Sequence, residues 1–163
     1  MYILTSSIVV FFWLILPFFT LATFLIVASY HFGKEDSVFG KIKKSKLSGL
    51  FLFLKGSIVI LAPLYFHSHE TIKIFEILNV KLIQYNTNLI IVLIFLSLIS
   101  NFFINKNILL SLLDSCTIII LNMSFEPLLA FTVYFCFLHS VRHSLSLIQD
   151  IDSRDLKKGL KSF

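Results

Sequence analysis

Three of the five histidines lie in two apolar segments that are far apart in the chain. His31 closes the first long apolar run, and His139 and His143 lie near the end of the last one. Residues four apart share one face of a helix, so both imidazoles of the second pair face the same way. Imidazole is a common ligand for Fe, Zn and Cu, and polar groups in membrane segments are costly enough to suggest function. The pattern predicts a metal site formed by His31, His139 and His143.

Histidines also have a simpler use, which is to anchor a helix in the headgroup region of a bilayer. For His139 and His143 alone both interpretations stand, and His31 at the same membrane depth favours the metal site. His67 and His69 fall at the other end of the second apolar run, about 30 Å away across the bilayer. We interpret these two as interfacial anchors.

Charged residues near the histidines allow further interpretations. Asp36 follows His31 by five residues, so it is either a carboxylate that orients an imidazole from behind or an ordinary loop residue, the simpler interpretation. Asp114 lies within an apolar run and needs a partner, for which Lys55 is a candidate. Arg142 is expected to extend to the lipid headgroups. Motifs of serine hydrolases, phosphate-binding loops and zinc proteases do not occur.

Composition indicates which elements position these side chains. Of the 163 residues 57% are hydrophobic and 14% charged, against about 45–50% and 25% in soluble domains, and the mean hydropathy is +0.91. No residue before Lys34 is charged, and a membrane span needs about 20 apolar residues. The first run is too long and lacks the basic start of a cleaved signal peptide. The chain is therefore predicted to be one all-α integral membrane domain.

Five apolar runs are expected to span the membrane, followed by a cytoplasmic tail at 149–163. Lysine and arginine concentrate in the first and third loops and in the C-terminal region, which the positive-inside rule places in the cytoplasm. This predicts an outward N-terminus in a multi-pass plasma-membrane protein. It also accounts for the net charge of +5 without a nucleic-acid surface. The expected spans are 3–29, 47–66, 88–104, 108–123 and 127–148. The basic residues of the first and third loops are Lys34, Lys41, Lys43, Lys44, Lys46 and Lys106, and those of the C-terminal region are Arg142, Arg154, Lys157, Lys158 and Lys161. The second loop has only Lys73 and Lys81.

Three sequence segments resemble one known family. The segment 29–36 reads SYHFGKED, 62–70 reads APLYFHSHE, and 127–143 reads PLLAFTVYFCFLHSVRH. In order and approximate spacing they are similar to motifs of the Brp/Blh family of β-carotene 15,15′-dioxygenases. The third segment is the most specific, although Leu138 stands where the family usually has Trp. The resemblance covers nearly the whole chain.

The resemblance implies a membrane enzyme that uses Fe(II) and O₂ to cleave β-carotene at its central double bond. The products are two molecules of all-trans-retinal, which can serve a rhodopsin. His31, His139 and His143 match three of the four iron-binding histidines of the family. The fourth lies in an early GxxHGxxD-like segment without a counterpart here, so the chain is expected to be N-terminally truncated relative to the family.

Two other functions remain open from the sequence. One is a non-catalytic or degenerate membrane protein of the same fold that lacks a full iron site. The other is a metal-binding or haem-binding electron-transfer protein, in which His31 and His139 could supply ligands from facing helices.

Overall fold

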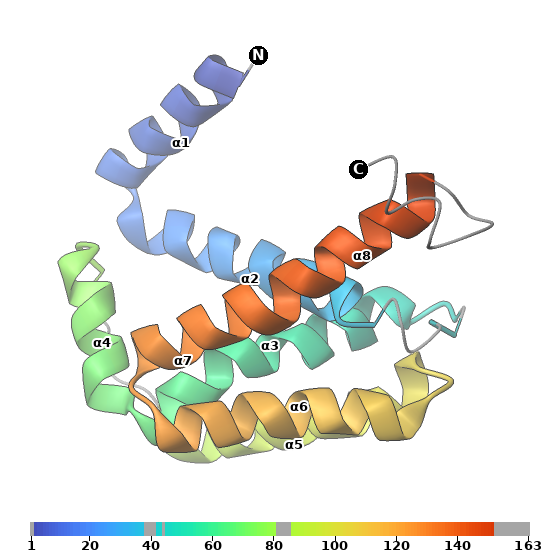
Figure 1. The fold of residues 1–163 in the computed structure, drawn as a ribbon. Helices are drawn as coiled ribbons and strands as arrows, with labels where there is room; N and C mark the ends of the chain where they lie inside the picture. Colours follow the sequence, from blue (N-terminus) through green and yellow to red (C-terminus); the bar gives the residue numbers. More distant parts are fainter. Residues whose placement is uncertain (1, 38–41, 44, 81–85, 152–163) are drawn as a thin grey trace.

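The structure, a computed structural model, describes residues 2–37, 42–43, 45–80 and 86–151 (Figure 1). Within these ranges the chain is helical, and its only β-type pairing is an isolated bridge between Ile42 and Asn105. This confirms the all-α class. The elements are α1 (Tyr2–Ile15), α2 (Pro17–Glu35), α3 (Ser48–Phe66), α4 (Ser68–Ile77), α5 (Thr87–Ile104), α6 (Ile108–Ser124), α7 (Pro127–Val133), the π-helix η1 (Tyr134–His139) and α8 (Ser140–Ile151).

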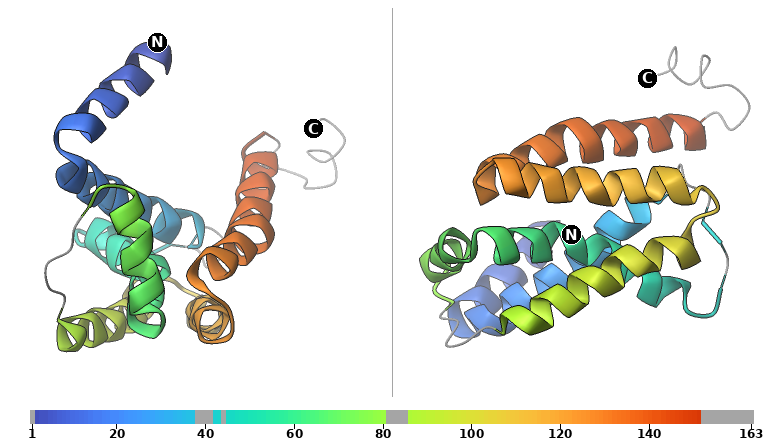
Figure 2. Two further views of the ribbon diagram at one scale, coloured as in Figure 1. Left: turned by 90° about the vertical axis from the view of Figure 1, so that its left-hand side faces the viewer. Right: turned by 90° about the horizontal axis from the view of Figure 1, so that it is seen from below.

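The first apolar run, predicted as one span at 3–29, is divided into two helices. Leu16 leaves helical geometry with φ −133° and ψ 62°, and Pro17 begins α2. Proline disfavours helical backbone in the residue before it but fits the first position of a new helix. In Figures 1 and 2 α1 turns away from the bundle at this point, while α2 lies against the other helices.

Helix α3 forms the centre of the bundle and packs closely on α2. Gly33 of α2 and Gly56 of α3 lie at this crossing, where a Cβ on Gly33 would stand 1.8 Å from the carbonyl oxygen of Leu52 and one on Gly56 1.8 Å from that of Ser29. Small residues permit such approaches between membrane helices. The contact fixes the end of α2, which carries His31.

Helices α5 and α6 form a hairpin that packs on α3, and they diverge from the turn that joins them (Figure 2). Their N-termini are capped by asparagine side chains, Asn86 for α5 and Asn107 for α6. Buried polar groups join the two helices: the amide of Asn101 donates to Ser115 Oγ at 3.1 Å and accepts from Ser111. Such hydrogen bonds stabilise helix pairs in a membrane.

The last segment is a continuous rod made of α7, η1 and α8, and it crosses in front of α2 and α3 (Figure 1). Within it the backbone N–H of Ser140 donates to the carbonyl of Phe135, five residues back. This spacing defines a π-turn, which proteins often place at functional sites. The turn ends at His139.

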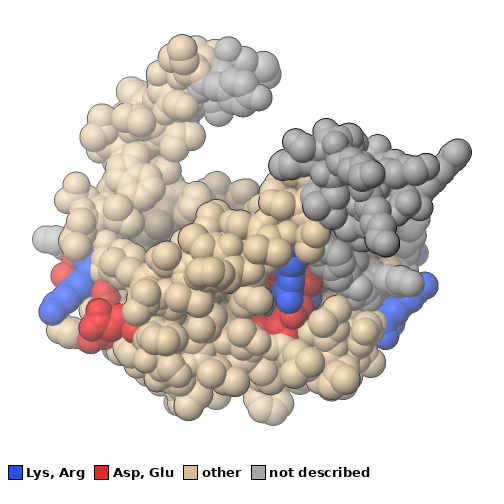
Figure 3. Space-filling view, in the orientation of Figure 1, with Lys and Arg blue, Asp and Glu red and all other residues tan. Residues whose placement is uncertain are grey.

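The outer surface is largely apolar, as expected for a membrane protein. Charged atoms occupy only a few small groups on the face in Figure 3. In the part of the chain that the structure describes, three helical segments are long and apolar enough to cross a membrane, Ser48–Phe66, Thr87–Ile104 and Pro127–Leu147. The predicted number of spans and the orientation stay predictions, as does the extent of the single domain. Lys41, Lys44, Lys81 and the basic residues from Arg154 lie outside the described residues, as does the tail from 152 onward.

Candidate metal centre

The three histidines predicted as ligands lie together. The ring centroids are 5.4 Å apart for His31 and His139, and 6.4 Å apart both for His31 and His143 and for His139 and His143. His139 is 4% exposed, whereas His31 is exposed on α2. All three line an open cavity of about 570 Å³, here called the histidine cavity. Its other lining residues are Phe24, Val27, Ala28, Phe32, Phe135, Ser140 and Ser144.

Asp36 is not an ordinary loop carboxylate. It caps the C-terminus of α2 and is only 5% exposed. Its Oδ2 accepts a hydrogen bond of 2.7 Å from the hydroxyl of Tyr134, and its Oδ1 lies 3.9 Å from Nδ1 of His139. Asp36 Oδ1 and His139 Nδ1 are both buried, and neither has a hydrogen-bond partner. The carboxylate is therefore next to the imidazole that it would orient.

Arg142 also lies differently from the prediction, because it turns into the bundle instead of extending to the headgroups. One guanidinium nitrogen lies 2.5 Å from Oδ1 of Asp114, and the other 3.7 Å from Oδ1 of Asp36. Lys55, the partner expected for Asp114, donates to the carbonyl oxygen of Asp36 and to Ser37 Oγ, both at 3.1 Å. Two acidic and two basic side chains thus form a buried cluster without net charge, which lowers the cost of burying each one.

Glu35 is a site residue that sequence reasoning missed. Its Oε2 lies 3.2 Å from Nδ1 of His143 and 3.5 Å from Ser146 Oγ. Consecutive carboxylates at the end of α2 therefore face two histidines that are one helical turn apart. Glu35 directly precedes Asp36, and the sequence placed both in the loop after the expected span 3–29, without indicating which residue of the last helix Glu35 faces.

Tyr134 was missed for a geometric reason. In a regular α-helix residues five apart point about 140° away from each other, so Tyr134 and His139 would not share a partner. The π-turn between them brings both toward Asp36. Phe135 stacks on the His139 ring at 5.3 Å, and Phe32 meets the same ring edge-on at 4.9 Å.

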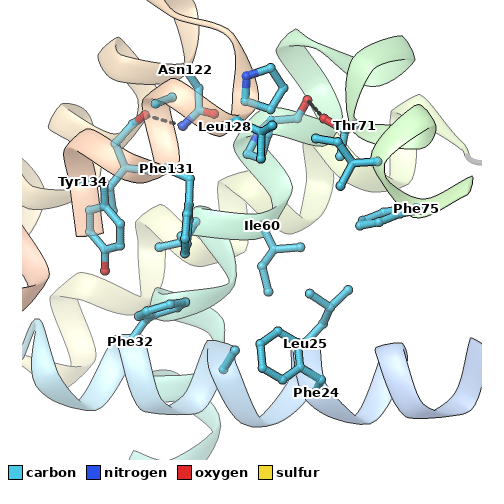
Figure 4. Close-up of a pocket in the computed structure, with 17 residues that line it drawn as sticks. Phe24, Leu25, Phe32, Ile60, Thr71, Phe75, Asn122, Leu128, Phe131 and Tyr134 are labelled. Carbon is cyan, nitrogen blue, oxygen red and sulfur yellow. Dashed lines mark hydrogen bonds between the residues drawn. The ribbon is translucent and has the colours of Figure 1, made fainter. Parts of the chain in front are cut away.

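A second cavity, of about 210 Å³ and here called the apolar cavity, adjoins the histidine cavity and shares Phe24, Ala28 and Phe32 with it. Side chains from α2, α3, α4, α6 and α7 surround it, together with Tyr134 (Figure 4). Its polar side chains already have hydrogen-bond partners. The Thr71 hydroxyl contacts the carbonyl oxygens of Pro63 and His67, the Asn122 amide donates to the carbonyl oxygen of Ile118, and the Tyr134 hydroxyl donates to Asp36. The cavity therefore presents hydrocarbon.

The chemistry of the donor set suits a histidine-ligated metal, since three imidazoles face one cavity and two of them have a carboxylate at Nδ1. The histidine rings lie farther apart than they would around a bound metal ion. With metal–nitrogen bonds of about 2.0–2.1 Å, ring centroids around a tetrahedral ion stand about 5 Å apart, against the 5.4 and 6.4 Å found here. Among the described residues no three His, Cys, Asp or Glu side chains are already arranged to hold an ion. Metal binding would require rotation of the rings toward one another.

The other two histidines lie away from the centre. His67 joins α3 to α4, and His69 is exposed in the first turn of α4. That junction lies at the C-terminal end of α3, eleven residues and about three helical turns beyond Lys55. The structure does not bring either residue to the histidine cavity.

Comparison with known proteins gives one match. Neither the curated proteins nor the solved structures contain a match to this chain. The family model described as beta-carotene 15,15'-dioxygenase matches residues 1–163. This confirms the resemblance to the Brp/Blh proteins drawn from the three sequence segments. The chain belongs to the β-carotene 15,15′-dioxygenase family.

Proposed function

We propose that the protein cleaves the central 15,15′ double bond of β-carotene with O₂ to give two molecules of all-trans-retinal. Family membership supports a dioxygenase of this kind. The reaction balances without a further reductant, because the double bond breaks and each of its carbons gains one oxygen atom as an aldehyde. One observation carries the proposal: His31, His139 and His143 meet from two distant helices at a cavity that adjoins an apolar one.

His31, His139 and His143 would hold Fe(II), with Asp36 orienting His139 from behind. The iron would supply the activation of O₂, and neutral imidazoles suit it as ligands. The chain's own contribution is to place the ligands and to exclude water. Phe32 and Phe135 cover the His139 ring, and the buried charge cluster holds Asp36 in place.

The apolar cavity supports a hydrocarbon substrate. It lies beside the histidines, and its polar side chains are already bonded within the protein. Phe32 and Tyr134 separate it from His139. We propose that one half of β-carotene occupies this cavity while its centre lies at the imidazoles. A substrate dissolved in the bilayer can enter from the lipid-facing surface.

The proposed setting is the plasma membrane, with several spans, the N-terminus outside and the C-terminus in the cytoplasm. The apolar exterior and the three span-length helices support a membrane location. The product can pass through the same bilayer to a rhodopsin. The substrate is then supplied, and the aldehyde consumed, without passing through water.

The test is retinal formation in membranes of β-carotene-producing cells. We expect retinal with the parent chain and none with His139→Ala. His69→Ala is the matched control, since that histidine is exposed on α4, and it should retain activity. Absence of retinal from a well-expressed parent chain would contradict the proposal.

A second candidate is a non-catalytic protein of the same fold that binds carotenoid. It is favoured by one observation, namely that the imidazoles of the described chain are not yet arranged around an ion. It predicts bound carotenoid in purified protein without retinal, and no loss of pigment in His139→Ala. The dioxygenase predicts retinal from the parent chain, and more intact carotenoid with His139→Ala than with the parent because cleavage stops.

A further inference from the structure

Two histidines of the site have their own carboxylates, and both carboxylates come from the end of α2. Glu35 Oε2 lies 3.2 Å from Nδ1 of His143, within hydrogen-bond distance. Asp36 Oδ1 lies 3.9 Å from Nδ1 of His139, and both atoms are buried and without a hydrogen bond, while the same Oδ1 lies 3.7 Å from the Arg142 guanidinium. In each pair the carboxylate faces Nδ1, which leaves Nε2 as the nitrogen available to the cavity.

A carboxylate accepts hydrogen bonds and cannot donate one when ionised. A histidine that faces a carboxylate through Nδ1 therefore carries its proton on that atom. Its Nε2 is then unprotonated and has a free lone pair for a metal. Partners of this kind fix the tautomer and the ring orientation of metal-binding histidines.

We propose that Glu35 is a positioning residue that fixes His143 in the tautomer with the proton on Nδ1, so that Nε2 faces the histidine cavity. It faces Nδ1 of His143 at 3.2 Å, closer than Asp36 faces Nδ1 of His139 at 3.9 Å. This inference rests on the proposed function for the identity of the metal, but the tautomer itself is a property of the metal-free protein.

The surroundings of Glu35 agree with this assignment. Its side chain is 13% exposed, whereas that of His143 is 44% exposed. The carboxylate is thus the less accessible partner and the imidazole the one that opens to the cavity. Ser146, one turn of α8 beyond the imidazole, has its hydroxyl 3.5 Å from the same Oε2 and donates to the carbonyl of His143 at 2.9 Å. The pair is therefore held from both helices, α2 and α8.

The primary experiment is ¹⁵N NMR of histidine side chains in metal-free protein in lipid nanodiscs. The His143 signal is assigned by its loss in His143→Gln. We expect the parent protein to carry the His143 proton on Nδ1, and Glu35→Leu to show a mixture of tautomers. Glu35→Gln should restore the parent signal, because the amide oxygen accepts the same hydrogen bond. A proton on Nε2 in the parent protein would overturn the proposal.

The second readout is anaerobic titration with Fe(II). Loss of such a partner typically weakens metal binding 10–100-fold, which we expect for Glu35→Leu and not for Glu35→Gln. The matched control is Glu76→Leu, an exposed glutamate in the last turn of α4. Equal Fe(II) affinity and an unchanged tautomer in Glu35→Leu would refute the role of Glu35.

The two proposals fail in different ways. A Glu35-dependent tautomer together with no retinal from the parent chain would remove the proposed function and keep this inference. Retinal from the parent chain, together with a His143 tautomer that is the same in Glu35→Leu as in the parent, would keep the proposed function and remove this inference.

Discussion

At the scale of single residues, side-chain chemistry and spacing predicted which histidines meet but not what surrounds them. His139 and His143 share a helix face by periodicity, and His31 joined them through membrane topology and the family motif. Arg142, Glu35 and Tyr134 were misplaced or missed because each has a partner more than 20 residues away. A single sequence contains no local signal for such pairs.

Arg142 is the residue whose loss should cost the most stability among the charged side chains. It neutralises Asp114 at 2.5 Å and lies 3.7 Å from Asp36, both buried. Removing one partner of a buried ion pair leaves an uncompensated charge, which costs about 3–5 kcal/mol. We expect Arg142→Leu to lower the free energy of unfolding by about that amount, measured by SDS titration in mixed micelles.

The double variant Arg142→Leu with Asp114→Leu should recover part of this loss, because the orphaned carboxylate is removed as well. Lys73→Leu, at an exposed position on α4, is the control and should change little. A loss for Arg142→Leu no larger than that of the control would mean that the cluster contributes no stability.

At the scale of elements, apolar runs predicted most helices well. The expected runs 47–66, 88–104 and 108–123 agree with α3, α5 and α6 to within a residue at each end. The failures have local causes that hydropathy does not register. Pro17 divides the first run into two helices, and the π-turn at Tyr134–His139 changes the register of the last one. Because hydrophobicity averages over a window, it reports neither a break nor a change of helical pitch.

The α2–α3 crossing should tolerate no side chain at Gly56. A Cβ there would stand 1.8 Å from the carbonyl oxygen of Ser29, a backbone atom that cannot rotate away. Overpacking of this kind costs about 1–3 kcal/mol, and we expect Gly56→Ala to reach the upper end. Gly49→Ala in the same helix is the control, since nothing lies within 4 Å of its Cβ. It should be neutral or stabilising by up to about 1 kcal/mol. Equal unfolding transitions for the two variants would refute the close contact.

The π-turn can be tested by deleting one residue from it. Removal of Phe137, which is 72% exposed, would leave Tyr134 and His139 four residues apart, and at α-helical pitch such residues point within about 40° of each other. Both side chains would still face Asp36, so we expect parental helix content by circular dichroism and Fe(II) affinity close to that of the parent. Phe137→Leu keeps the turn and should also bind as the parent does. Fe(II) binding about 10-fold weaker or more in the deletion variant would show that the histidine needs the π-turn itself and not only a face shared with Tyr134.

At the scale of the whole molecule, composition predicted the class because hydropathy is a sum over all residues. The arrangement of the helices was beyond reach, since it depends on which small and polar residues meet across helices. The apolar cavity is an example. Its lining comes from α2, α3, α4, α6 and α7 and the residues beside them, and no pattern in one segment indicates that these five meet.

If one half of β-carotene occupies the apolar cavity, filling that cavity should remove activity without removing the metal. Leu25 projects from α2 into this space (Figure 4), and Leu25→Trp would occupy part of the approximately 210 Å³. Because the imidazoles lie beyond Phe32, Fe(II) affinity should stay within about twofold of the parent value. Retinal formation should fall at least 10-fold, which corresponds to a loss of about 1.4 kcal/mol in transition-state stabilisation.

The neighbouring residue offers a matched control. Ile26 is 56% exposed and lines neither cavity, so Ile26→Trp adds the same ring on the lipid-facing side and should leave retinal formation unchanged. Comparable activity of the two tryptophan variants would place the substrate elsewhere. A loss of Fe(II) binding in Leu25→Trp would instead mean that the two cavities are coupled through Phe32. The cavity would then shape the metal site as well as hold the polyene.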